Sequence, residues 1–336
     1  MKSIEESLRQ EAKRLLSEKR VDVVVGYEAG PLPATTAPAF VTDPEGADRL
    51  VWNPFCSLNL AKYVHDLLFE HRQAQKRVKP EERRRKVVAV VARGCTSRSV
   101  VLHLQERQYE REDVVLLGVP CAGFVDRRKA AKALQGEELL GAGEDGDRLT
   151  LRSRMEEKSV PLAELLAESC AVCRTNQPVL ADVFLGDPAP AMDCAREYAS
   201  VEEHEKLELE ERWAAFARET AKCIRCFACR NACPGCYCKS CAIEQTQPEW
   251  MGITVDPSDT QVFQLMRIYH QAGRCVDCGA CAAACPMGVD LRKYLKKLDK
   301  DAFELFGRRA GESLDGVPVL AEASEKDEQS FIFEPK

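Results

Sequence analysis

Cysteine carries most of the recognisable chemistry in this sequence. The chain has 336 residues, 17 of them cysteine, and two stretches have the form Cys-x-x-Cys-x-x-Cys-x-x-x-Cys-Pro. The first run is Cys223, Cys226, Cys229 and Cys233, and the second run is Cys275, Cys278, Cys281 and Cys285. The first three thiolates of such a run can bind three irons of a cubic [4Fe–4S] cluster, and a fourth ligand must come from elsewhere. The spacing therefore predicts two such clusters.

The fourth ligand of each cluster follows from the rule of two-cluster ferredoxins, in which the last Cys of one run binds the other run's cluster. By this rule Cys285 completes the cluster of the first run, and Cys233 completes that of the second. Crossed ligation places two clusters close together, as the transfer of single electrons requires. Zinc bound by two Cys-x-x-Cys pairs explains neither the third Cys of each run nor the Cys-Pro that ends it.

Three more cysteines directly follow the first run, at Cys236, Cys238 and Cys241. Thiolates bind soft metals well, which favours a further cluster or metal whose fourth ligand comes from the N-terminal part of the chain. The alternative is a cysteine-rich loop with reserve thiols. Disulfides are rare in cytoplasmic proteins, so ligation is the first hypothesis for this loop.

The N-terminal half alternates predicted strands with predicted helices. Two continuous apolar strands, at 86–95 and 113–121, are followed by helices at 97–108 and 126–135. They are preceded by a helix at 1–20, a strand at 21–27, a short strand at 49–52 and a helix at 58–72. Buried strands that alternate with helices are typical of a mainly parallel sheet covered on both faces. The sequence thus predicts an α/β N-terminal domain.

Both apolar strands end in a cysteine, Cys95 and Cys121. In open α/β sheets the ligand crevice lies outside the carboxyl ends of the strands, so these two thiols can share one site. With Cys170 and Cys173 they would form a four-thiolate set for an additional cluster.

Outside the cysteines the sequence offers few candidate functional residues. Arg93 and Arg98 flank Cys95 and could offset the charge of a cluster or bind a flavin phosphate, or they could be ordinary salt-bridge residues. No Ser/His/Asp or Cys/His set is evident, so no catalytic residue is predicted. The glycines of 141–147 do not lie between a strand and a helix, which excludes a dinucleotide-binding fingerprint and predicts a solvated loop.

The predicted organisation has three parts. The α/β domain spans 1–195, an all-α ferredoxin domain with two [4Fe–4S] clusters spans 196–310, and a flexible acidic tail spans 311–336. An acidic helix at 200–219 joins the first two parts. Between the cysteine runs, 262–270 has the apolar pattern of a helix.

Charge and hydropathy exclude two classes of partner. A formal net charge of -6 and a pI near 5.6 leave no basic excess for nucleic acid. No stretch approaches the roughly 18 apolar residues of a membrane span, and the N-terminal helix has no apolar middle like that of a signal peptide. We therefore expect a cytoplasmic protein whose partners are other proteins.

The cysteine runs and the helix between them resemble a known domain. The helix at 262–270 and the segment 274–298, which begins RCVDC, are similar to the α-helical ferredoxin domain in the iron–sulfur subunits of succinate dehydrogenase, heterodisulfide reductase and anaerobic glycerol-3-phosphate dehydrogenase. The resemblance covers about residues 215–305. It implies a helical domain that holds two [4Fe–4S] clusters.

The N-terminal part resembles a second family through ARGCTSRSVV at 92–101, GVPC at 118–121 and CAVCRTNQPVLADVFLG at 170–186. This is the beta-subunit family of deazaflavin-reducing hydrogenases and formate dehydrogenases, whose members bind FAD and an iron–sulfur cluster and join larger complexes. The chain departs from that family in carrying its ferredoxin motifs after the α/β domain and in lacking the Gln that follows the Cys of the second motif. FAD is therefore an open alternative.

Together the two resemblances imply an iron–sulfur electron-transfer subunit of anaerobic metabolism, more an electron carrier than a catalyst. It would relay single electrons between a dehydrogenase or hydrogenase module of the formate, hydrogen or NADH type and a heterodisulfide reductase-like complex, whose subunits are the expected partners. Two [4Fe–4S] clusters are expected, and one or two additional clusters are possible. The alternative function is a flavin-containing oxidoreductase subunit whose N-terminal domain exchanges electrons with a soluble carrier.

Overall fold

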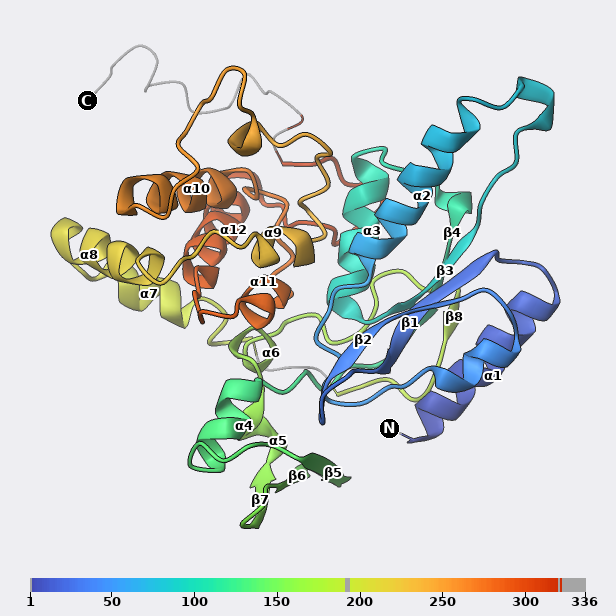
Figure 1. Ribbon diagram of the computed structural model, residues 1–336, viewed down its shortest axis with the longest axis horizontal. Helices are drawn as coiled ribbons and strands as arrows, with labels where there is room; N and C mark the ends of the chain where they lie inside the picture. The colour runs from blue at the N-terminus through green and yellow to red at the C-terminus, as the bar shows by residue number, and fades with distance from the viewer. Residues whose placement is uncertain (1, 191–193, 320, 322–336) are drawn as a thin grey trace.

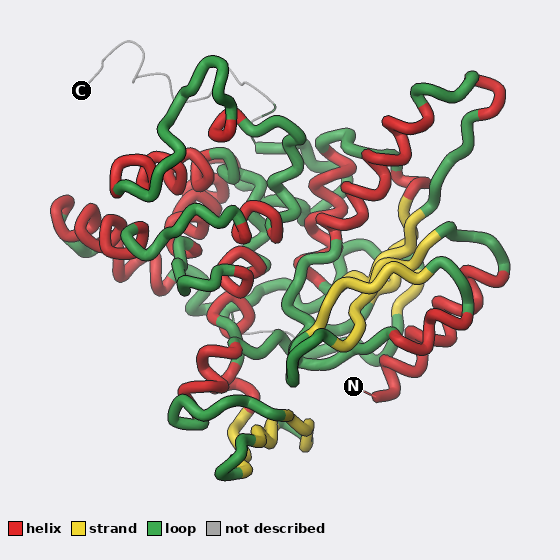
Figure 2. Tube along the Cα trace, in the orientation of Figure 1, coloured by secondary structure: helices red, strands yellow, loops and turns green. Residues whose placement is uncertain are grey.

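The computed structural model describes residues 2–190, 194–319 and 321, and it has two parts (Figure 1). Figure 2 shows the strands gathered in the N-terminal part, whereas helices and loops make up the cysteine-rich part. The arrangement confirms a mainly parallel sheet in the N-terminal half, followed by a helical region that contains most of the cysteines.

The larger sheet has five strands in the order β2-β1-β3-β4-β8. The strands are β1 (Val23–Ala29), β2 (Thr36–Val41), β3 (Val88–Ala92), β4 (Val114–Gly118) and β8 (Val183–Phe184). The pairs β1–β3, β3–β4 and β4–β8 are parallel, and β2 pairs with β1 in antiparallel orientation. All five residues of β3 are buried, as expected for a central strand covered on both faces.

Helices cover the two faces of this sheet (Figure 1). Helix α1 (Lys2–Ser17) lies on one face, and α2 (Ala61–Gln75) and α3 (Gly94–Gln105) lie on the other. Leu8, Ala12 and Leu15 of α1 are fully buried, because their spacing places them on one side of the helix. Helix α3 begins directly after β3, which places Cys95 in the first turn of a helix at the carboxyl end of the sheet.

Near the N-terminus one predicted strand was wrong and one strand was missed. The segment expected as a strand at 49–52 is not one, because η1 (Glu45–Arg49) is a 3-10 helix and a loop follows it. The true second strand is β2, which contains Pro38. A proline lacks the N–H that a central strand needs, but β2 lies at the edge of the sheet, where one side of the strand has no partner strand.

A small antiparallel sheet replaces the solvated loop that was predicted at 141–147. Its strands are β5 (Gly141–Asp145), β6 (Arg148–Arg152) and β7 (Glu157–Pro161), flanked by α4 (Arg127–Ala133) and α5 (Leu162–Leu165). Gly146 has a φ of 60° and makes the tight turn between β5 and β6 possible. Leu149 and Leu151 alternate along β6 and are buried, which anchors the sheet to the protein.

The cysteine-rich part is built from short helices around a small apolar core. Its helices are α7 (Ala199–Glu205), α8 (Leu209–Thr220), α9 (Ala228–Ala232), α10 (Pro257–Tyr269), α11 (Ala280–Ala284) and α12 (Arg292–Phe306). The remaining short helices of the chain are α6 (Glu168–Ala171), η2 (Pro80–Glu82), η3 (Arg111–Asp113) and η4 (Ala242–Glu244). Phe216, Ile268 and Leu295 belong to the core, and cysteines of both runs pack against it.

Helix α10 contains most of the segment predicted as helical between the two runs. The acidic helix predicted at 200–219 is instead two helices, α7 and α8. Glu208 begins α8 with a capping box. Its carboxylate accepts the backbone N–H of Glu211, and the Glu211 carboxylate accepts the backbone N–H of Glu208. Within the described residues, no helix is both long enough and apolar enough to cross a membrane.

The two parts are held together by buried polar contacts. Arg98 of α3 donates to the backbone oxygen of Ala310 at 3.0 Å, and Arg274 forms an ion pair with Glu106 at 2.6 Å. Gly311, in the segment predicted as a flexible tail, is buried, and a Cβ there would lie 2.0 Å from the Arg98 oxygen. Residues 320 and 322–336 of that predicted tail lie outside the described residues.

Candidate metal centres

The two cysteine runs share one local fold, although they have few residues in common besides cysteine. In each run the second residue after the first Cys is left-handed and donates its N–H to that Cys, as Arg225 does to Cys223 Sγ and Asp277 to Cys275 Sγ, both at 3.4 Å. The residue after the second Cys is also left-handed, and α9 or α11 follows it. N–H groups directed at sulfur favour the thiolate that binds metal.

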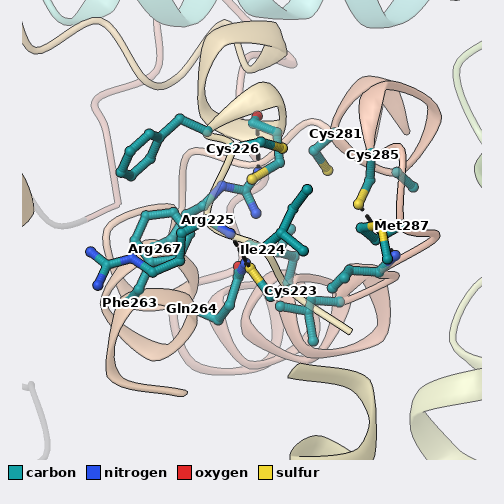
Figure 3. A pocket seen from close by; sticks show the side chains of 16 residues that line it. Cys223, Ile224, Arg225, Cys226, Phe263, Gln264, Arg267, Cys281, Cys285 and Met287 are labelled. Carbon is teal, nitrogen blue, oxygen red and sulfur yellow. Dashed lines mark hydrogen bonds between the residues drawn. The ribbon is translucent and has the colours of Figure 1, made fainter. Parts of the chain in front are cut away.

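The first cavity is lined by Cys223, Cys226 and Cys229 of the first run and by Cys281 and Cys285 of the second. Figure 3 shows side chains of both runs around the same space. Cys223 Sγ accepts a hydrogen bond from Gln264 Nε2 at 3.3 Å, and Cys285 Sγ accepts one from the Val289 N–H at 3.3 Å. The structure thus brings together the four cysteines predicted for the cluster of the first run.

The second cavity is lined by Cys233, Cys275, Cys278 and Cys281, which are the four cysteines predicted for the cluster of the second run. Cys281 lines both the first and the second cavity, so it lies in the wall between them. The last cysteine of each run thus lies at the cavity of the other run, Cys285 at the first cavity and Cys233 at the second. Burial raises the pKa of the Cys275 thiol, so metal ligation there must displace a proton.

The third cavity is lined by Cys95, Cys121, Cys170 and Cys173. Three of these sulfurs accept backbone N–H groups, from Gly123 to Cys121 at 3.3 Å, from Phe124 to Cys170 at 3.4 Å and from Thr175 to Cys173 at 3.4 Å. Burial raises the pKa of the Cys170 and Cys173 thiols to about 12. The four-thiolate set predicted from the strand ends and from the Cys-x-x-Cys pair therefore converges in space.

The second and third cavities adjoin each other. Val276, Asp277 and Cys278 line both of them. Cys95 and Cys278 line the same third cavity, and burial raises the pKa of the Cys278 thiol. The three cavities therefore form a row, with Cys281 between the first two and Cys278 between the last two.

The three cysteines of 236–241 line none of these cavities. Cys236 lies beside Cys233 and accepts a hydrogen bond from Gln271 Nε2 at 3.5 Å, whereas Cys238 is exposed. Between them, Tyr237 stacks on His65 with ring centroids 4.9 Å apart and so docks the loop onto α2. The ligation predicted for these cysteines finds no converging set among the described cavities.

Besides Arg292, which is ion-paired, four buried arginines line the three cavities. Arg225 lines the first cavity, Arg267 lines the first and second, and Arg93 and Arg98 line the third. Their exposed fractions are 7%, 5%, 2% and 5% in that order. Among the described residues none of the four forms an ion pair with Asp or Glu, so the salt-bridge interpretation of Arg93 and Arg98 is not supported.

Such arginines need another source of negative charge, because a buried charge without a counter-charge is costly. A [4Fe–4S] cube held by four thiolates carries negative net charge and would supply it in each cavity. Burial acts to lower the pKa of Arg93, but Coulomb attraction, first to Tyr27 and then to Cys95 and Cys121, raises it above its ordinary value. The charge of the cavity walls therefore fits anionic clusters.

The donor geometry fits cubes better than single ions. Among the described residues, no group of three or more His, Cys, Asp or Glu side chains lies close enough together for one metal ion. In a cube each cysteine binds a different iron, so the sulfurs surround the cluster and do not converge on one atom.

Acidic side chains near the cavities are neutralised by bases. Asp277, between two ligand candidates of the second run, pairs with Arg292 at 2.6 Å and with Lys296 at 3.4 Å. Lys296 also pairs with Glu197 at 2.8 Å and is itself buried. This network contributes little net charge to the second cavity, unlike the four unpaired arginines.

An open groove leads away from the third cavity. A cavity of about 570 Å³ shares Phe124 and Ser169 with it. This space continues into a cleft of about 1290 Å³ through shared residues that include Phe55. Arg127 and Lys129 line the inner cavity, and the buried Ser169 Oγ has no hydrogen-bond partner among the described residues. The groove could hold an elongated anionic molecule beside the third cavity.

Sequence reasoning did not identify Arg225, Gln264 or Arg267 as site residues. Arg267 had a usable signal, because it interrupts the apolar residues of α10 on a helix between two cysteine runs. A charged residue in an apolar stretch needs a buried counter-charge or a path to solvent. Gln264 and Arg225 carried no such signal, since their approach to sulfur or to the cavity depends on the fold.

No protein-family profile matches this chain. The chain is similar to the F420-dependent formate dehydrogenase subunit beta of Methanocaldococcus jannaschii, with 22% identity over 340 aligned positions that cover 83% of this chain and 84% of the relative. It is also similar to the F420-dependent formate dehydrogenase 1 subunit beta of Methanococcus maripaludis, with 27% identity over 122 positions, 35% of this chain and 31% of the relative.

Among solved structures, a chain of the F420-reducing [NiFe] hydrogenase complex from Methanosarcina barkeri aligns with a TM-score of 0.36 and 13% identity. The alignment covers 51% of this chain and 59% of that chain.

Proposed function

We propose that this protein is a cytoplasmic iron–sulfur electron-transfer subunit that holds three [4Fe–4S] clusters in a row. The observation that carries the proposal is the convergence of the cysteines into three adjoining cavities with shared walls, each lined by at least four cysteines. Clusters 1, 2 and 3 denote the cubes proposed for the first, second and third cavity. When bound, each cube would accept and release one electron at a time.

The chain's own residues define the order of the three sites. Cys281 separates the first cavity from the second, and Cys278 separates the second from the third. Neighbouring cavities thus share wall residues, and this closeness favours electron transfer along the row. The ligands proposed for cluster 3 all come from the proposed domain at 1–195, and those proposed for cluster 2 all come from the proposed domain at 196–310. The two domains therefore act together in this arrangement.

The first cavity is the outer end of the row. Cys226 is exposed, and Ile224 and Met287, which also line this cavity, are 50% and 45% exposed. An apolar rim around a redox centre favours contact with another protein that excludes water. We propose that the heterodisulfide reductase-like partner exchanges electrons here, consistent with the resemblance of this part to the iron–sulfur subunit of heterodisulfide reductase.

The third cavity is the inner end and connects to the N-terminal part. Two relatives of this chain are named as subunits of F420-dependent formate dehydrogenases. By analogy we propose that the other partner is a dehydrogenase or hydrogenase module that supplies electrons near cluster 3.

The iron content of the purified protein tests the proposal. Iron and acid-labile sulfide are measured per chain after anaerobic purification, and the clusters are counted by electron paramagnetic resonance (EPR) during stepwise reduction. Three cubes predict about 12 irons and 12 sulfides, since each cube has four of each. About 8 irons would reject cluster 3, and fewer than 8 in folded, fully reconstituted protein would reject the proposal.

The groove favours a second candidate function, a subunit that also binds a flavin. The inner cavity adjoins the third cavity, carries Arg127 and Lys129 at its wall, and continues into the larger cleft. A flavin there could convert the electron pair of a soluble carrier into single electrons for the row. Flavin absorbance in the purified protein, and its loss in an Arg127→Glu/Lys129→Glu variant that keeps its iron, would support this function.

A further inference from the structure

Arg267 lies between the first two cavities. It belongs to α10, is 5% exposed, and lines both the first and the second cavity. Among the four unpaired arginines it has this position alone, since Arg225 lines the first cavity and Arg93 and Arg98 line the third. Figure 3 shows Arg267 near Phe263 and Gln264 of the same helix.

The contacts of Arg267 are with the cluster loops. Its Nη2 donates to the backbone oxygen of Cys229 at 3.3 Å. Its Nε is buried without a partner among the described residues. It lines the first cavity together with Cys229 and Cys281, and the second cavity together with Cys233 and Cys281. Its positive charge is therefore available to both cavities.

We infer that Arg267 sets the reduction potentials of clusters 1 and 2 together; this inference rests on the proposed function. Reduction adds one negative charge to a cluster, and a buried cation beside it stabilises the reduced form. A cation in the shared wall stabilises the reduced form of both neighbours.

The other bases near these cavities cannot supply the same effect. Arg292 and Lys296 pair with Asp277, so their charge is offset at short range. Arg274, which lines the second cavity, pairs with Glu106. Arg225 has its guanidinium over the Phe263 ring and donates to backbone oxygens of the 252–254 loop on the side of the first cavity.

The test is a redox titration of the full-length protein with its clusters, in which EPR follows each cluster separately. The variants are Arg267→Met, which removes the charge, and Arg267→Lys, which keeps it. The control is Lys222→Met, which removes a charge next to Cys223 from an exposed side chain already paired with Glu219. Iron per chain is measured for every sample.

For Arg267→Met we expect the equilibrium constant for reduction of clusters 1 and 2 to fall at least tenfold each, a downward shift of about 59 mV per one-electron couple. We expect no change in the midpoint potential of cluster 3, because Arg267 does not line the third cavity. Arg267→Lys should show less than half of the shift, and Lys222→Met should match the wild type.

Unchanged midpoints in Arg267→Met, or a shift confined to one cluster, would overturn the inference. So would a full shift in Arg267→Lys, since that result would point to geometry and not to charge. If Arg267→Met loses iron, Arg267→Gln takes its place, because it also removes the positive charge. Its midpoint potentials are then compared with those of Arg267→Lys by the same criteria. Failure of the proposed function looks different, because the wild-type protein itself would then lack the EPR signals of clusters 1 and 2.

Discussion

Gly94 offers a way to disturb cluster 3 without removing any of its ligands. It precedes Cys95 at the start of α3, and its Cα faces the loop that follows Cys173. A Cβ at this position would lie 1.9 Å from the Thr175 backbone oxygen and 2.9 Å from the Gln177 backbone oxygen. Backbone atoms cannot rotate away as a side chain can, so Gly94→Ala must push the two segments apart.

The size of the movement can be worked out from these contacts. Ordinary contact begins at 3.4 Å, so the Thr175 oxygen must move by about 1.5 Å. Sites that bind metals or catalyse reactions tolerate misplacement of roughly 0.5 Å. The movement separates Cys95 from Cys173, and overpacking of this kind costs about 1–3 kcal/mol of unfolding free energy.

We expect Gly94→Ala to lose cluster 3 and to keep clusters 1 and 2. Iron per chain should fall from about 12 to about 8, and the EPR signals of clusters 1 and 2 should be unchanged. Gly143→Ala is the matched control, because no heavy atom lies within 4 Å of a Cβ built there. It should keep the wild-type iron content and unfolding transition.

Two results would refute this reasoning. A folded Gly94→Ala protein with wild-type iron would mean that Cys95 and Cys173 do not bind the same cluster. Loss of all three clusters, in a variant whose circular dichroism matches the wild type, would mean that the third site is not a separate centre.

Three further predictions concern ligation, the contact between the two parts, and pH. Cys285→Ala should disturb cluster 1, and Cys233→Ala should disturb cluster 2, each with loss of one to four irons per chain. Cys238 is exposed, so the control Cys238→Ala should keep the wild-type iron content. Crossed ligation would be excluded if EPR showed loss of cluster 2 in Cys285→Ala and of cluster 1 in Cys233→Ala. Glu106→Gln breaks the ion pair with Arg274, in which Glu106 is 13% exposed and Arg274 is 21% exposed. We expect this variant to lower the unfolding free energy, measured in urea titrations, by about 2 kcal/mol. The control Glu112→Gln, which breaks an exposed ion pair with Arg85, should lower it by less than about 0.5 kcal/mol. A thiol must lose its proton to bind iron, and burial raises the pKa of Cys170 and Cys173 to about 12. Lowering the pH from about 8 to about 6 should therefore speed the loss of iron to a chelator. A rate of iron loss that does not depend on pH would contradict protonation of these ligands.

The fold was predictable where local pattern and tertiary environment agree. The apolar run of β3 and the spacing of Leu8, Ala12 and Leu15 in α1 indicated their structures correctly, because both depend on burial alone. The strand β2 was missed since its proline is tolerated only at an edge, which is a property of the sheet. The hairpin around Gly146 was missed because its glycines and acidic residues also suit a solvated loop.

For the candidate site, the sequence by itself determined the sets of candidate ligands. Cysteine spacing is a local property, and from it we predicted cysteine sets whose members line common cavities, with Cys285 at the first cavity and Cys233 at the second; their ligation stays a prediction. The row of three cavities was decided only by tertiary structure, because it depends on how α3, the loop after β4 and the second run meet. The charge of those cavities was also decided there: Arg93 and Arg267 are ordinary basic residues in the sequence and become uncompensated buried cations only when folding removes them from water and places no carboxylate of the described chain beside them.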